Sequence, residues 1–238
     1  RQMCIRDSVM DCGNAAAAIC APEIFKNFNV DLTELYCDVD GTFPNHHPDP
    51  TVESNLTDLI KAMKTGNYDV GIAFDGDADR VGVVDETGAV VWADQLMALF
   101  LPELVSPGDE ILFDVKCSKA LEEMITRYQG KPVMWKTGHS LIKQKMFEHN
   151  CKFGGEMSGH IFFADDYYGY DDAIYVAARL LQTLSSSKKT LSQLTAELPK
   201  YFSTPEIRLE ANSDEEKFKI SKKAVEYFSS NFDCITID

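Results

Sequence analysis

Strand-like and helix-like segments alternate along most of this chain, and no other feature constrains its fold as strongly. In the first part, strands are expected over 9–12, 30–36 and 69–74, helices over 13–28 and 51–65, and a hairpin over 81–92. In the second part, strands are expected over 110–115 and 132–136, and helices over 93–105, 118–128, 139–149 and 171–184. This βαβ rhythm predicts an α/β protein with two consecutive mixed-sheet domains.

The ends of the chain do not follow this rhythm. Residues 1–8 show no helical or strand period, and we treat them as foreign to the fold. A linker is expected at Pro205, followed by a strand, a helix over 213–230 and a strand that something beyond Asp238 continues. The expected domains are therefore residues 1–90, residues 91–202, and a truncated third segment over residues 203–238.

Composition excludes several classes of function. The formal net charge of −15 argues against general affinity for nucleic acid or for an anionic membrane. No apolar run reaches the roughly 18 residues that span a bilayer, and no signal peptide opens the chain. Seven scattered cysteines without a CxxC pair favour neither a disulfide framework nor a zinc knuckle. A cytoplasmic location is expected.

Three aspartates crowd the segment AFDGDADRVG, residues 73–82, between two apolar runs. Asp75, Asp77 and Asp79 repel one another unless a cation neutralises them, and carboxylate oxygens are the ligands that Mg²⁺ and Ca²⁺ prefer. An EF-hand loop is the weaker alternative, because Arg80 stands where that loop needs glycine and strands flank the segment. A solvated acidic turn is the other alternative. The alternation of carboxylates therefore favours a metal site.

A glycine-rich segment, KFGGEMSGHIFF over residues 152–163, is the second candidate site. Its glycines allow close approach of the backbone to a ligand, and Glu156, Ser158 and His160 offer an acceptor, a hydroxyl and a titratable ring. These groups suit a polyol, although glycine loops also serve as plain turns.

Basic groups follow two of the expected strands. Lys116 follows FDV, and WKTGHS places Lys136, Thr137 and His139 where a strand meets the start of a helix. Helix starts and lysines both attract phosphate, although a single lysine is more often a plain surface charge. Together these residues predict a basic rim in an otherwise acidic chain.

These motifs resemble one family, the α-D-phosphohexomutases, and in particular its bacterial phosphomannomutase/phosphoglucomutase branch. DGDADR is similar to the family's Mg²⁺ loop, with Ala78 in place of a glycine, and GEMSGH is similar to its sugar-recognition loop. YCDVDGTFPNHHPDP, FDVKCS and KTGHSLIK also resemble family segments, in the same order, from about Val9 to Asp238. The resemblance implies the second and third of four phosphohexomutase domains and the start of an α+β fourth domain.

The resemblance also implies a reaction. Family members move a phosphate between O1 and O6 of a hexose through a phosphoserine and a hexose 1,6-bisphosphate. Their serine loop, usually TASHNP-like, has no counterpart in this sequence, so the chain alone is expected to be inactive. The implied partners are glucose and mannose 1- or 6-phosphates.

Residue roles follow from the same resemblance. Asp75, Asp77 and Asp79 are expected to hold Mg²⁺, and Arg80, Lys116 and His160 to be catalytic. The expected substrate-binding residues are Lys116, Thr137, Gly138, His139, Glu156, Ser158 and His160. Two other classes stay open: a non-catalytic fragment that binds sugar phosphate or Mg²⁺, and a metal-dependent phosphatase.

Overall fold

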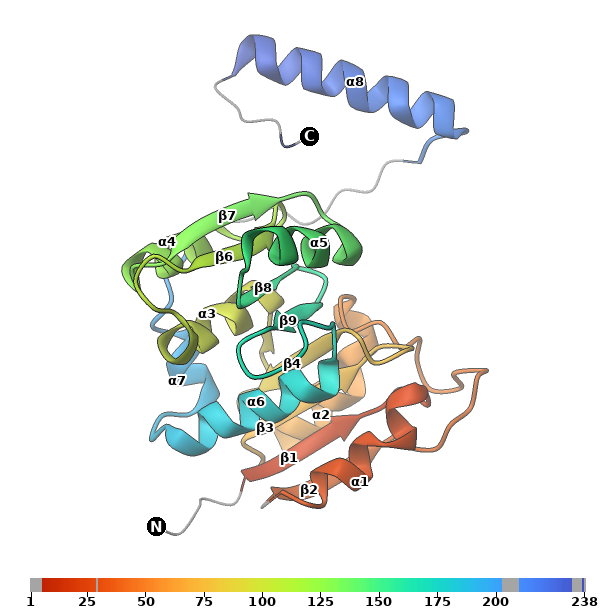
Figure 1. The fold of residues 1–238 in the computed structure, drawn as a ribbon. Helices are drawn as coiled ribbons and strands as arrows, with labels where there is room; N and C mark the ends of the chain where they lie inside the picture. The colour runs from red at the N-terminus through yellow and green to blue at the C-terminus, as the bar shows by residue number, and fades with distance from the viewer. Residues whose placement is uncertain (1–5, 29, 203–209, 233–236, 238) are drawn as a thin grey trace. The chain divides into compact units, whose positions relative to one another are not determined.

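The chain forms two compact units, residues 1–201 and residues 202–238 (Figure 1). The structure is a computed structural model, and it describes residues 6–28, 30–202, 210–232 and 237. Within these ranges no helix is long and apolar enough to cross a membrane. The two units are described separately.

The first unit contains a five-stranded sheet in the order β2-β1-β3-β4-β5. Its strands are β1 (Arg6–Asp11), β2 (Val30–Leu35), β3 (Val70–Phe74), β4 (Val81–Asp85) and β5 (Val90–Val91). β1 pairs in parallel with β2 and β3, whereas β4 runs antiparallel to β3 and β5. Every residue of β3 and β4 is buried, as expected for strands covered on both faces.

A second sheet, of four strands, repeats the arrangement of β1 to β4 in the first sheet. Its order is β7-β6-β8-β9. The strands are β6 (Glu110–Asp114), β7 (Lys131–Trp135), β8 (Phe153–Gly155) and β9 (Ile161–Phe163). β6 pairs in parallel with β7 and β8, and β9 returns antiparallel to β8. The turns after β3 and β8 therefore hold equivalent places in the two sheets.

Helices cover both sheets and join them. The helices of this unit are η1 (Ala16–Ile19), α1 (Ala21–Phe25), η2 (Glu53–Leu56), α2 (Thr57–Thr65), α3 (Ala93–Leu104), α4 (Lys119–Arg127), α5 (His139–His149), α6 (Ala173–Ser186) and α7 (Leu191–Thr195). α2 and α6 both pack on β3 and β4, and α6 also contacts β9 of the other sheet. One apolar core consequently runs from the first sheet to the second.

Two expectations about the first residues are wrong. β1 begins at Arg6, so residues 6–8 belong to the sheet and are not foreign to the fold. The continuous helix expected over 13–28 is instead a 3₁₀ turn and a short helix. Gly13 and Asn14 adopt left-handed backbone conformations with φ of 53° and 57°, and Pro22 lies at the start of α1. These residues prevent one uninterrupted helix.

The second unit contains the helix expected near the end of the chain. This helix, α8 (Asp214–Asn231), is capped by Ser213, whose side chain accepts a hydrogen bond from the backbone N–H of Glu216. The described part of α8 has no buried residue. The linker expected at Pro205, the strand expected next to it and most of the last strand lie outside the described residues.

Candidate active site

The DGDADR and GEMSGH turns meet in the first unit, although they are far apart in the sequence. DGDADR follows β3 and precedes β4, and GEMSGH links β8 to β9. The backbone N–H of Val81 donates to the carbonyl of Gly159 at 3.2 Å, which joins the two turns directly. The turns follow β3 and β8, each of which pairs in parallel with a neighbouring strand. Both turns thus lie at the carboxyl ends of parallel strands, where open α/β sheets place their ligands.

Asp75 organises the aspartate turn. Its carboxylate accepts hydrogen bonds from the backbone N–H groups of Asp79 and Arg80, each at 3.1 Å. Ala78 adopts a left-handed conformation with φ of 65°, and its carbonyl accepts from the N–H of Ala173 at the start of α6 at 3.0 Å. The turn is thus fixed both by its own first aspartate and by the helix that joins the two sheets.

Arg80 is held by carboxylates on two sides. Its Nε donates to Asp75 Oδ2 at 2.7 Å, and its Nη1 donates to Asp49 Oδ1 at 3.2 Å. Burial raises the pKa of Asp75, and the hydrogen bonds and charge of Arg80 oppose that rise. The arginine therefore keeps one edge of the aspartate turn positively charged.

Glu156 anchors the second turn. Its side chain is buried, and it accepts hydrogen bonds from the backbone N–H of Gly138 and from Nδ1 of His160, the latter at 2.9 Å. Burial disfavours the charged form, but the hydrogen bonds from His160 and Gly138 lower the pKa of Glu156. An ionised acceptor thus links GEMSGH to the start of α5.

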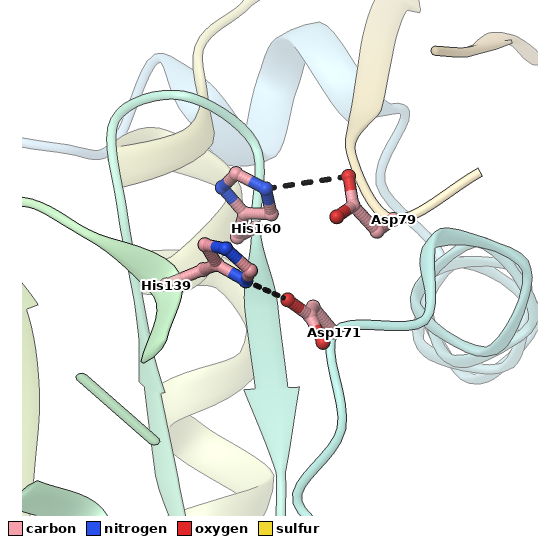
Figure 2. Close-up of side chains that lie close together, drawn as sticks. All are labelled: Asp79, His139, His160 and Asp171. Atoms are coloured by element: carbon pink, nitrogen blue, oxygen red, sulfur yellow. Dashed lines mark hydrogen bonds and ion pairs between the residues drawn. The ribbon is translucent and has the colours of Figure 1, made fainter. Parts of the chain in front are cut away.

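Two histidines and two aspartates lie together where the turns meet (Figure 2). Asp79 and His160 belong to the two turns, and His139 and Asp171 lie next to them. Nε2 of His160 is 3.3 Å from Asp79 Oδ1, and Nδ1 of His139 is 2.8 Å from Asp171 Oδ2. The imidazole rings stack with centroids 5.2 Å apart. Burial opposes the cationic form, but Glu156 and Asp79 raise the pKa of His160. The ring is therefore poised to carry a proton.

The expected metal ligands are close enough to share one ion. Ligand oxygens of Asp75, Asp77 and Asp79 all lie within 4.8 Å of one another. Asp77 is exposed, whereas Asp75 is buried, so the group opens to solvent on one side. Three hard oxygen donors fit Mg²⁺, which keeps several waters and takes few protein ligands. The EF-hand alternative fails because β3 and β4 flank the turn.

The structure brings most of the expected substrate-binding residues to this place. Glu156, Ser158, His160, Gly138 and His139 are linked by direct contacts in the described chain. Ser158 Oγ lies 2.8 Å from His160 Nδ1.

Lys116 and Thr137 are positioned differently. Lys116 is exposed in the turn after β6, and it forms no ion pair with any residue that the structure describes. Thr137 donates its hydroxyl proton to Asp114 Oδ2 at 2.8 Å. Thr137 is itself exposed, and this hydrogen bond ties the start of α5 to the end of β6.

Three further aspartates were missed by the sequence interpretation. Asp49 binds Arg80, and Asp171 pairs with His139 and Lys143. Asp114 is fully buried at the end of β6 and accepts from Thr137 and from the N–H of Met157. An aspartate that ends an apolar strand was the available signal for Asp114. Asp49 lies in the segment YCDVDGTFPNHHPDP and Asp171 at the start of an expected helix, but neither was assigned a role in the site.

Comparison of the sequence with known proteins identifies the family to which this fold and these two turns belong. The family model described as phosphoglucomutase/phosphomannomutase, alpha/beta/alpha domain II, matches residues 6–88, and the model for domain III matches residues 92–202. The chain belongs to the phosphoglucomutase/phosphomannomutase family of α-D-phosphohexomutases.

Individual relatives agree with this assignment. The chain is 50% identical over 214 residues to a phosphomannomutase/phosphoglucomutase of Pseudomonas aeruginosa, which covers 89% of this chain and 46% of that protein. It is 45% identical over 202 residues to a phosphoglucomutase of Neisseria meningitidis, covering 84% and 44%. A crystal structure of a family protein from Burkholderia thailandensis matches with a TM-score of 0.80 at 43% identity, covering 85% and 44%. The chain thus spans less than half the length of these relatives.

Proposed function

We propose that this chain is part of a phosphomannomutase/phosphoglucomutase. The whole protein would transfer a phosphoryl group between O1 and O6 of a hexose phosphate through a phosphoserine and a hexose 1,6-bisphosphate. The relatives that carry this name support the proposal. The present chain would supply the metal turn and the sugar turn, which correspond to the second and third domains.

One observation carries the proposal: the aspartate turn and the GEMSGH turn are in direct contact. The Val81–Gly159 hydrogen bond of 3.2 Å and the His160–Asp79 pair at 3.3 Å place carboxylates beside a hydroxyl, an imidazole and a buried glutamate. A phosphorylated sugar offers a dianion, which Arg80 and a Mg²⁺ ion held by the aspartates would attract, and hydroxyls, which the GEMSGH groups would bind. This juxtaposition favours a sugar phosphate over an isolated phosphate ester.

The aspartate turn would serve the phosphoryl group. Asp75, Asp77 and Asp79 would hold Mg²⁺, which when bound would neutralise charge on the transferring phosphoryl group. Arg80 would position the phosphoryl oxygens, because Asp75 and Asp49 fix its guanidinium from two sides. These two carboxylates give Arg80 one orientation before substrate arrives.

The GEMSGH turn would bind the sugar. Glu156 and Ser158 would contact hydroxyls, and they would discriminate poorly at C2, so glucose and mannose phosphates would both be substrates. His160 would transfer a proton, since Glu156 holds its Nδ1 and its pKa is raised. Exposed Lys116 would face the substrate as a second catalytic group.

The start of α5 would receive phosphate. Residues 137–139 include the first residue of this helix, and helix starts favour anions; the N–H of Gly138 already binds Glu156, so the phosphate would approach from the side of His139. Gly138 has φ of 140°, a conformation that side chains rarely adopt, and it turns the chain into the helix.

Calorimetry with Mg²⁺ tests the metal assignment. Asp77→Asn should weaken Mg²⁺ binding, because it removes one of three carboxylates while Asp77 is exposed and contributes little to folding. Asp166→Asn, at an exposed acidic residue outside the cluster, is the matched control. Equal heats for both variants would contradict the assignment.

A coupled enzyme assay tests whether this chain needs the rest of the protein for mutase activity. This chain alone should not convert mannose 1-phosphate to mannose 6-phosphate, because no segment of it resembles the phosphoserine loop. The intact protein that contains it should, and Asp75→Ala in that protein should abolish the conversion. Turnover by the chain alone above an Asp75→Ala background would show that the nucleophile has been misplaced.

A further inference from the structure

The four side chains of Figure 2 form a second group of potential metal ligands. Asp79, His139, His160 and Asp171 each offer one atom, and these atoms all lie within 4.8 Å of one another. Asp79 also belongs to the Asp75, Asp77 and Asp79 group. The two groups therefore share one carboxylate and differ in chemistry, since only the second contains nitrogen donors.

One of the two ligand pairs in this group already has the separation found in a tetrahedral metal site, and the other is slightly shorter. Zinc–nitrogen bonds of about 2.0 to 2.1 Å and tetrahedral angles place neighbouring ligand atoms about 3.3 to 3.4 Å apart. His160 Nε2 and Asp79 Oδ1 are 3.3 Å apart. His139 Nδ1 and Asp171 Oδ2 are 2.8 Å apart, as a hydrogen bond requires, and would separate by about 0.5 Å when an ion replaced the shared proton.

Groups outside the four ligands already orient them. Glu156, whose side chain is 2% exposed, binds Nδ1 of His160 and leaves Nε2 directed at Asp79. Carboxylate–histidine contacts of this kind usually stand behind metal-bound histidines, where they fix the ring and raise its basicity. Lys143 binds the other oxygen of Asp171 at 2.8 Å and leaves Oδ2 for the cluster.

We propose that Asp79, His139, His160 and Asp171 form a second site, selective for borderline divalent ions such as Zn²⁺. Two imidazoles with two carboxylates suit Zn²⁺ or Co²⁺, whereas Mg²⁺ prefers oxygen ligands and octahedral geometry. The ion would take Asp79 from the aspartate turn, so its binding would compete with Mg²⁺. Only this competition depends on the Mg²⁺ assignment proposed above.

Cobalt titration of the full chain tests the site, because Co²⁺ reports its own coordination. Four-coordinate Co²⁺ with histidine ligands should give an intense visible absorption that Zn²⁺ abolishes. His139→Gln and Asp171→Asn should each weaken Zn²⁺ binding at least about tenfold, since altering even an outer partner of a metal ligand costs 10- to 100-fold. Circular dichroism would confirm that both variants fold, and His139 is largely exposed.

Two controls separate this site from others. Asp77→Asn should leave the cobalt spectrum unchanged while it weakens Mg²⁺ binding. His149→Gln should also leave it unchanged, because His149 forms a histidine–carboxylate pair with Glu110 at 2.6 Å outside the cluster.

Three outcomes would overturn the proposal: a weak octahedral spectrum, a loss of zinc affinity in Asp77→Asn but not in His139→Gln, or a thiolate charge-transfer band. That band would place the ion at cysteines such as Cys12 and Cys37, whose sulfurs are 3.2 Å apart. If Zn²⁺ binds as proposed but saturating Mg²⁺ leaves its apparent affinity unchanged, the second site stands and the competition through Asp79 fails.

Discussion

Replacing Gly159 with alanine should destabilise the contact between the two turns. Gly159 has φ of 102°, and a Cβ placed there would lie 2.8 Å from the carbonyl oxygen and 3.3 Å from the nitrogen of Val81. Both neighbours are backbone atoms at the start of β4, so neither can rotate away. The substitution therefore combines conformational strain with a collision against a fixed strand.

The expected cost has two parts. A left-handed conformation costs a non-glycine residue about 1 to 2 kcal/mol. Relieving the collision would separate Val81 from Gly159 and remove their 3.2 Å hydrogen bond, which is worth about 0.5 to 1.5 kcal/mol. Together these terms give a loss of about 1.5 to 3.5 kcal/mol in the free energy of unfolding.

Gly108→Ala is the matched control. Gly108 has φ of 90°, but a Cβ there would meet nothing within 4 Å, so only the conformational part should appear, about 1 to 2 kcal/mol. Urea unfolding followed by tryptophan fluorescence suits both variants, because Trp92 and Trp135 lie in the first unit. Equal losses in the two variants would refute the collision and, with it, the tight apposition of the two turns.

Three other outcomes follow from the site. Although burial opposes the charged form, the pKa of His160 should exceed the usual value of about 6.5 in an NMR titration and should fall in Glu156→Gln. Because the pKa of His160 is higher in the folded state than in the unfolded state, the protonated ring stabilises the fold fully below about pH 6.5, and this stabilisation is lost as pH rises through the folded-state pKa. A free energy of unfolding that did not change over this pH range would contradict the argument. Lys143→Met should raise the pKa of Asp171 in a carboxyl ¹³C titration, whereas Lys145→Met should not. Mg²⁺ at 100 times its dissociation constant should raise the free energy of unfolding by about 2.7 kcal/mol, and an unchanged urea midpoint would argue against folded-state binding.

Local sequence was sufficient to predict the α/β class and most elements of the first unit. The run VGIAF predicted a buried strand, and β3 spans Val70–Phe74 with every residue buried. The ETG turn predicted a hairpin, and Gly88 has the positive φ that it requires. These features depend on side-chain period and on glycine conformation within a few residues. The same reasoning failed over residues 13–28, where one helix was expected but Gly13 and Asn14 make a turn.

The chemical types in the two turns were also visible in the sequence, but their encounter was not. Nothing local to Asp79 or His160 indicates that their side chains lie 3.3 Å apart, because the two residues are about 80 positions apart in the sequence and belong to turns of different sheets. That contact exists because α6 packs on both sheets and its first residue, Ala173, binds the carbonyl of Ala78.

The partners that loops supply to Arg80 and His139 could be predicted from the sequence even less. The sequence patterns around Asp49 and Asp171 assigned neither residue a partner, and each acquires its role only when folding brings Arg80 or His139 within hydrogen-bond distance. A sequence determines which donors and acceptors a chain possesses and how each short segment is bent. The distances that turn those groups into a site arise from packing between distant segments, which is a property of the tertiary structure.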